Sequence, residues 1–138
     1  MVKIKNPVLL SIQPEYVAQI LAGTKTEEYR KQKPQADVKF AVIYCTKGDK
    51  SKYRSKVSNA PQPGIVAVAE IKEIGPNDDK QSEYKYAYHL SHVRAFNQPI
   101  PLSDVFPKIK PQQVAIYLDV EEVQALLDKY PSKVVRKK

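Results

Sequence analysis

The chain has 138 residues, of which 42% are hydrophobic and 28% are charged, and its formal net charge is +8. These values are typical of a single soluble globular domain with a hydrophobic core. No apolar run approaches the roughly 20 residues of a membrane-spanning helix. The N-terminus lacks the apolar segment of a signal peptide, so we expect a cytoplasmic protein with no membrane contact. The one cysteine, Cys45, excludes an internal disulfide and a cysteine-based metal site.

The excess positive charge lies in two segments. Residues 47–56 hold five basic residues and one acidic residue, whereas residues 129–138 hold five basic residues and no acidic one. The rest of the chain is therefore close to neutral. Localised positive charge favours a polyanion such as RNA or DNA as the partner, although basic loops and tails are also often only solvated.

The first two predicted elements are a buried strand over 7–12 and a short helix that starts at Pro14. Proline suits the first helical turn, and Gly23 suits the C-terminal cap, where a left-handed backbone is needed. Between them, apolar residues recur at helical spacing on one face, namely Tyr16, Val17, Ile20 and Leu21. We expect this helix to deliver the next segment to one mouth of the fold.

That next segment, residues 23–30, reads Gly-Thr-Lys-Thr-Glu-Glu-Tyr-Arg. In an extended chain Glu28 and Arg30 share one face, whereas Lys25 reaches that face only if a turn or bulge intervenes. The neighbouring positive charge should keep Glu28 ionised. Lys25 and Arg30 offer donors suited to phosphate or to a polarised carbonyl. On charge pattern alone, a surface ion pair on a solvated strand is the commoner explanation.

The segment 38–45 is the strongest strand candidate, and we expect it to be central because it is rich in β-branched and aromatic residues. A long polar connection over 48–63 follows it. Its Tyr53 lies between two cations, a composition that can stack a base and follow a nucleic-acid backbone. The candidate backbone contacts here are Lys47, Lys50, Lys52, Arg54 and Lys56.

Residues 64–74 form the next predicted strand, and Glu70 interrupts its apolar pattern. A buried carboxylate needs a cation or hydrogen-bond donors. We therefore hypothesise that Glu70 pairs with Lys25 or Arg30, with an outward-pointing Glu70 as the equally open alternative.

A third long strand is predicted over 84–96, where Tyr84, Tyr86 and Tyr88 share one face. A row of aromatic residues of this kind is more often core than a base-stacking platform. The two histidines of this strand are three residues apart and face opposite sides, so they cannot chelate one metal ion. We expect neither a metal ion nor a cofactor.

The remaining elements are a short strand over 114–118, a helix over 121–127 and a basic C-terminal tail over 131–138. The tail follows Pro131, which ends the helix, and we expect it to be mobile.

Four features, in this order along the chain, resemble the ASCH family of PUA-like domains. The first is Gly-x-Lys-x-x-Glu-x-Arg over 23–30, called the signature segment below, and the second is Tyr-x-Thr-Lys over 44–47. The third is the strand that carries Glu70, and the fourth is the turn Pro-Ile-Pro-Leu-Ser over 99–103. The resemblance covers most of the chain.

The resemblance implies an α+β fold, in which residues 1–130 form a small mixed PUA-like β-barrel with a short helix after the first strand and a C-terminal helix. It also implies that the protein binds RNA, or a nucleotide-like ligand, in a cleft beside the signature segment. The cleft residues that would contact the ligand are Lys25, Arg30, Tyr44 and Thr46, and the basic loop would follow its backbone. Simple packing at a strand end is an equally open interpretation of Tyr44 and Thr46.

Some relatives in this family are hydrolases, so an RNA- or nucleoside-directed hydrolase with Lys25, Glu28 and Glu70 as catalytic residues is the alternative. The amide-cleaving branch carries a threonine nucleophile three residues after its signature lysine. That position is Glu28 here, and Thr26 is only one residue from Lys25, which argues against the same chemistry. Gln13 is a further departure, because relatives often carry a lysine before this proline. A third hypothesis is a regulatory module that binds a nucleotide-like small molecule.

Overall fold

The computed structural model describes residues 4–48, 53, 60–112 and 114–137. Its strands are β1 (Pro7–Ile12), β2 (Glu27–Arg30), β3 (Phe40–Cys45), β4 (Gly64–Pro76), β5 (Tyr86–Ile100), β6 (Ile116–Tyr117) and β7 (Ser132–Arg136). The helices in the described ranges are α1 (Pro14–Ala22), α3 (Leu102–Val105) and α4 (Val120–Lys129). None of these helices is long and apolar enough to span a membrane.

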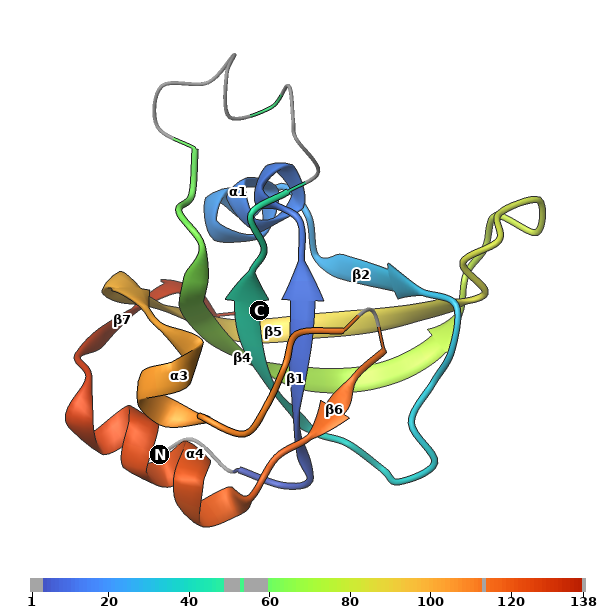
Figure 1. Cartoon of the computed structure of the whole chain (residues 1–138). Helices are drawn as coiled ribbons and strands as arrows, with labels where there is room; N and C mark the ends of the chain where they lie inside the picture. Colours follow the sequence, from blue (N-terminus) through green and yellow to red (C-terminus); the bar gives the residue numbers. More distant parts are fainter. Residues whose placement is uncertain (1–3, 49–52, 54–59, 113, 138) are drawn as a thin grey trace.

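The strands form one mixed sheet that curls into a half-barrel (Figure 1). Their order is β2-β5-β4-β3-β1-β6, and β7 pairs with β5 as well. β1 and β3 are parallel, and the other neighbours are antiparallel. The register between the long strands β4 and β5 shifts at several points, which lets them bend around the core. The predicted α+β class with a small mixed barrel is thereby confirmed, with the sheet curled into a half-barrel.

The beginning of the chain folds as its local signals predict. Pro14 lies in the first turn of α1, and Gly23 caps its C-terminus in the left-handed region with φ +82°. The N–H group of Gly23 donates to the carbonyl of Ile20 at 3.1 Å. The cap turns the chain sharply, so that the signature segment leaves α1 and enters β2 at the edge of the sheet.

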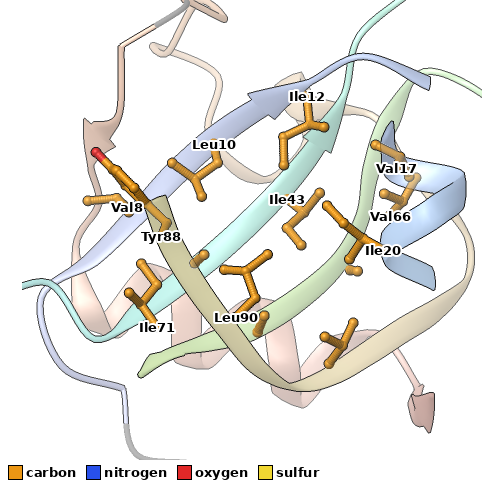
Figure 2. Packing of buried hydrophobic residues seen from close by; sticks show 14 of the residues in the cluster. Val8, Leu10, Ile12, Val17, Ile20, Ile43, Val66, Ile71, Tyr88 and Leu90 are labelled. Atoms are coloured by element: carbon orange, nitrogen blue, oxygen red, sulfur yellow. The ribbon is translucent and has the colours of Figure 1, made fainter. Parts of the chain in front are cut away.

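Hydrophobic residues cover both faces of the sheet. Val8 and Leu10 of β1 belong to one buried cluster, and the intervening Leu9 belongs to another, as the alternation of a strand requires. Figure 2 shows the first cluster, which Val17 and Ile20 of α1 cover. α4 covers the second cluster. β3 lies between β4 and β1 and is buried on both sides, which confirms its predicted central position.

The basic C-terminal segment is part of the sheet, so the prediction of a mobile tail is wrong. β7 pairs antiparallel with β5, with Val93 opposite Arg136 and Phe96 opposite Ser132. β5 is long enough to pair with β2 over its first residues and with β7 further along. A free stretch of strand edge therefore holds the segment in place, which the basic composition did not reveal.

Several boundaries also differ from those predicted. β5 begins at Tyr86 rather than at Tyr84, and it continues to Ile100 through part of the expected turn. α4 is longer than its apolar spacing indicated, and its N-terminal cap is Asp119, whose side chain accepts a hydrogen bond from the N–H group of Glu122.

Candidate functional site

A cleft of about 930 Å³ lies beside the signature segment. Its walls come from the end of β1, the start of α1, the segment 25–35, the residue after β3, the start of β5 with Tyr84 before it, and five residues on either side of position 113, namely Pro111, Gln112, Val114, Ala115 and Tyr117. Five of the chain's nine tyrosines line it, namely Tyr16, Tyr29, Tyr84, Tyr88 and Tyr117. We call it the tyrosine cleft.

The predicted pair of Glu28 and Arg30 lies in this cleft and is buried. Arg30 Nη1 lies 3.1 Å from Glu28 Oε2, and each side chain is only 9% exposed. The same nitrogen donates to the carbonyl of Ser11 at 3.1 Å. β2 presents these two side chains inward because they are two residues apart on a strand. The alternative of a solvated surface ion pair is therefore excluded.

Burial raises the pKa of Glu28, and the positive charges of Arg30 and Lys25 oppose this effect without cancelling it. The sequence predicts that the neighbouring charge keeps Glu28 ionised, but loss of water around the carboxylate has the larger influence on its pKa. Glu28 is thus a carboxyl group with a perturbed pKa inside a cleft, a property that is common at functional sites.

Lys25 reaches the same cleft because a turn intervenes, as its spacing required. The N–H groups of Thr24 and Lys25 both donate to the carbonyl of Gln19, at 3.0 and 3.1 Å, which closes the turn after α1. The ammonium group lies 5.2 Å from the ring centre of Tyr16 and 4.8 Å from that of Tyr29. Two cation–π contacts therefore hold the lysine between two aromatic walls.

Tyr88 anchors the cleft to the core. It is fully buried in the first hydrophobic cluster (Figure 2). Its hydroxyl donates to the carbonyl of Gln32 at 2.9 Å. Burial raises the pKa of Tyr88 to about 12. The prediction that the tyrosine row is core holds for Tyr88 and Tyr86, whereas Tyr84 is exposed and lines the cleft.

Ser11 adds a polar group that sequence reasoning missed. Its hydroxyl is buried and has no hydrogen-bond partner within the described part of the chain, and the residue lines the tyrosine cleft. A buried hydroxyl of this kind is suited to a polar group of a ligand. A serine within an apolar strand gave no signal of this role. The role of Tyr16 gave no signal either, because its spacing places it on the apolar face of its helix.

A comparison with known protein families identifies the family to which the chain belongs. The ASCH domain family matches over residues 10–130, which is most of the sequence. The chain is an ASCH domain. None of the curated proteins matches it.

Solved structures share the fold of this ASCH domain. ASCH from Zymomonas mobilis superimposes with a TM-score of 0.66 and 20% identity, covering 91% of this chain and 96% of that chain. A serine-to-alanine mutant of the Zymomonas protein gives a TM-score of 0.68 and 21% identity, covering 94% and 100%. A protein from Pseudomonas syringae gives 0.58 and 14% identity, covering 88% and 97%.

The other predicted binding residues of the ASCH domain are distributed unevenly. Thr46 lines the tyrosine cleft, and its hydroxyl accepts a hydrogen bond from the N–H group of Gly48 at 3.1 Å. Tyr44 packs against the second hydrophobic cluster, as expected for the end of a strand. Lys47 is exposed and does not line the cleft. Tyr53 is half-buried and lines neither the cleft nor the groove described next. The predicted contacts Lys50, Lys52, Arg54 and Lys56 lie outside the described residues.

Of the two possibilities for Glu70, the pair with Lys25 or Arg30 is wrong. The carboxylate of Glu70 pairs with His92 at 3.1 Å rather than with Lys25 or Arg30, and both residues line a separate groove. The proposed catalytic set of Lys25, Glu28 and Glu70 is therefore not assembled in one cleft. The reason is the register of the sheet, which places Glu70 opposite Ser91 on β5.

The other histidine, His89, lies 3.5 Å from Glu27, so each histidine has a carboxylate partner nearby. Among the described residues, no three His, Cys, Asp or Glu side chains gather in a way that would hold a metal ion.

Proposed function

We propose that this ASCH domain binds RNA and holds a nucleotide in the tyrosine cleft. The observation that carries the proposal is the placement of Lys25 between the rings of Tyr16 and Tyr29 at the wall of the cleft. Aromatic faces stack on bases, and a lysine beside them contacts phosphate, which is the usual combination in proteins that bind single-stranded nucleic acid.

Buried and exposed residues of the cleft have different roles. Arg30 is engaged by Glu28 and by the carbonyl of Ser11, so it shapes the floor of the cleft. Lys25 supplies a positive charge at the wall, and Lys31 and Lys33 add further charge along the same cleft. The chemistry therefore fits an anionic ligand with a flat ring. RNA is preferred over DNA because PUA-like domains typically bind structured RNA, as the family resemblance implies.

A hydrolase acting on RNA or on a modified nucleoside is the second candidate. It is favoured by one observation, the buried Glu28 whose pKa is raised by its burial in a cleft that also contains Lys25. A carboxyl group in that condition is suited to general acid or base catalysis. The candidate is weaker than binding because Glu28 is held by Arg30 and because Glu70 lies elsewhere.

The test is equilibrium binding of short unstructured RNA to the wild type, Lys25→Ala and Tyr29→Leu, with RNA integrity followed in the same tubes. Lys108→Ala is the matched control, because Lys108 is exposed and lies outside the cleft. We expect both cleft variants to weaken binding about tenfold or more, in line with the ~1–3 kcal/mol of one stacked base, and the control to bind like the wild type.

Intact RNA throughout would favour the binding function, whereas Lys25-dependent cleavage would favour the hydrolase. Equal binding by all variants contradicts both. Displacement of RNA by free mononucleotide at the same affinity would instead assign the cleft to a small nucleotide-like ligand.

A further inference from the structure

A second groove, of about 1080 Å³, runs along the sheet where β4, β5 and β7 meet. Its charged lining is almost entirely positive, with Glu70 as the one acidic residue among the described residues that line it. The cations are Lys5, Lys39, Lys72, Arg136 and Lys137. We call this the basic groove.

The cations of the basic groove come from parts of the chain that are far apart in sequence. Lys5 precedes β1, Lys39 precedes β3, Lys72 lies on β4, and Arg136 and Lys137 belong to the C-terminal segment. Folding thus gathers like charges that repel one another, and an anionic ligand is what would relieve that repulsion. The basic C-terminal segment contributes to this surface because β7 fixes it against β5.

The acids near the basic groove neutralise only part of this charge. Asp37 lies 3.9 Å from Lys5 and 3.3 Å from Lys39, but its side chain is largely exposed. Glu70 pairs with His92. Lys72 and Lys137 are exposed, and within the part of the chain that the structure describes no carboxylate forms an ion pair with either of them. The net charge of the lining therefore remains positive.

The basic groove and the tyrosine cleft are built for different parts of one ligand. No Tyr, Phe or Trp is among the described residues that line the groove, whereas five tyrosines line the cleft. Cations without aromatic rings contact phosphates, and aromatic rings stack on bases. Lys25 lines the cleft and the next residue, Thr26, lines the groove, so the two hollows meet across one short stretch of backbone beside the edge strand β2.

We propose that the basic groove binds the phosphodiester backbone of an RNA strand whose bases occupy the tyrosine cleft. The choice of RNA as ligand rests on the proposed function of the cleft, while the groove itself is a separate site. An RNA strand longer than the cleft would pass the Lys25–Thr26 backbone at the sheet edge and follow the cations of the groove.

The test compares a dinucleotide with a long unstructured RNA over a range of salt concentrations. The groove variant is Lys5→Ala/Lys72→Ala/Lys137→Ala, whose three positions are exposed and so should not affect folding. The control removes three exposed lysines that line neither hollow, Lys108→Ala/Lys110→Ala/Lys133→Ala. Thermal unfolding confirms that both variants are folded.

We expect the groove variant to bind long RNA about tenfold more weakly at low salt, with a dependence of log affinity on log salt that is shallower by about two, because each lost phosphate contact on a single strand contributes ~0.7. Its affinity for the dinucleotide should match that of the wild type, and the control should retain most of the affinity for long RNA. An unchanged affinity and salt slope in the groove variant, or an equal loss in the control, would overturn the inference.

The same measurements distinguish a failure of the proposed cleft function from a failure of the groove proposal. If Lys25→Ala leaves dinucleotide binding unchanged while the groove variant still loses long RNA, the groove stands and the cleft proposal fails. Polyglutamate that competes as well as polyphosphate at equal charge would overturn the assignment to phosphate and identify the groove as a surface for acidic polypeptides.

Discussion

The tyrosine cleft and the basic groove each contain a carboxylate that lies 3.1 Å from a nitrogen of a basic side chain, but the two contacts differ in their setting. In the cleft, Glu28 and Arg30 lie 3.1 Å apart and are both buried. In the groove, His92 and Glu70 also lie 3.1 Å apart, but their side chains are 58% and 34% exposed. Equal distances do not mean equal energies, because water screens the second pair and is excluded from the first.

This difference shows how the two sites use charge. The buried pair of the cleft shapes its floor, and the ligand-facing positive charge comes from Lys25 at its wall. The groove instead carries exposed cations at its surface, among them Lys72 and Lys137, which could face a ligand directly. The charged groups of the cleft therefore mainly stabilise its structure, whereas those of the groove would attract an anionic ligand.

The largest effect is expected from Glu28→Ala. Removing one partner of a buried pair leaves Arg30 buried and uncompensated, so the free energy of unfolding should fall by about 3–5 kcal/mol. Glu70→Ala is the matched change in the exposed pair and should cost about 1 kcal/mol or less. Denaturant unfolding of both variants measures the two losses. Similar losses would contradict the contrast between the two sites.

A smaller loss is expected from Arg136→Ala, which tests the link between the two hollows. Arg136 lines the groove, yet its guanidinium donates to the carbonyls of Lys25 and Leu90. We expect a stability loss of about 1–3 kcal/mol together with weaker dinucleotide binding, because the turn that positions Lys25 loses a support.

Lys133→Ala, an exposed change on the same strand, is the control for Arg136→Ala. Dinucleotide binding that is unaffected in the folded Arg136→Ala variant would show that the groove residue does not influence the cleft.

Tyr88→Phe should cost about 1 kcal/mol at neutral pH, because it removes the hydrogen bond to the carbonyl of Gln32. The pKa of Tyr88 is raised from 10.0 to about 12 in the folded protein, so the unfolded chain loses this proton first. The wild type therefore loses stability as the pH rises from about 10 to about 12, and its advantage over Tyr88→Phe shrinks in that range. Unfolding of the wild type and of Tyr88→Phe, measured between about pH 10 and pH 12, tests this pH dependence. Two parallel curves of stability against pH would contradict it.

The smallest effect is expected from Glu70→Gln. Removing the acidic charge from the lining of the basic groove should strengthen binding of long RNA by about two- to fivefold at low salt, as expected for an exposed charge worth up to ~1 kcal/mol. Glu73→Gln is the control, because Glu73 is an exposed acid of the same strand that does not line the groove. Weaker binding by Glu70→Gln would instead indicate that Glu70 contacts the RNA.

The local features of this protein were predictable from the sequence alone. The helix between Pro14 and Gly23, the central strand that ends at Cys45, and the shared face of Glu28 and Arg30 all follow from backbone preferences and short-range periodicity. The family resemblance led to the correct fold. It rests on the signature segment and three further features, which occur along this chain in the order that the family shows.

Only the tertiary structure decided which distant residues meet. The register between β4 and β5 placed Glu70 beside His92 rather than beside Lys25 or Arg30, the partners that one hypothesis gave it. The basic C-terminal segment pairs with the free edge of β5 as a strand, and this pairing places Arg136 beside the backbone of Lys25. Strand register and edge pairing depend on the whole sheet, and burial, which made the Glu28–Arg30 pair a structural element, depends on everything packed around it.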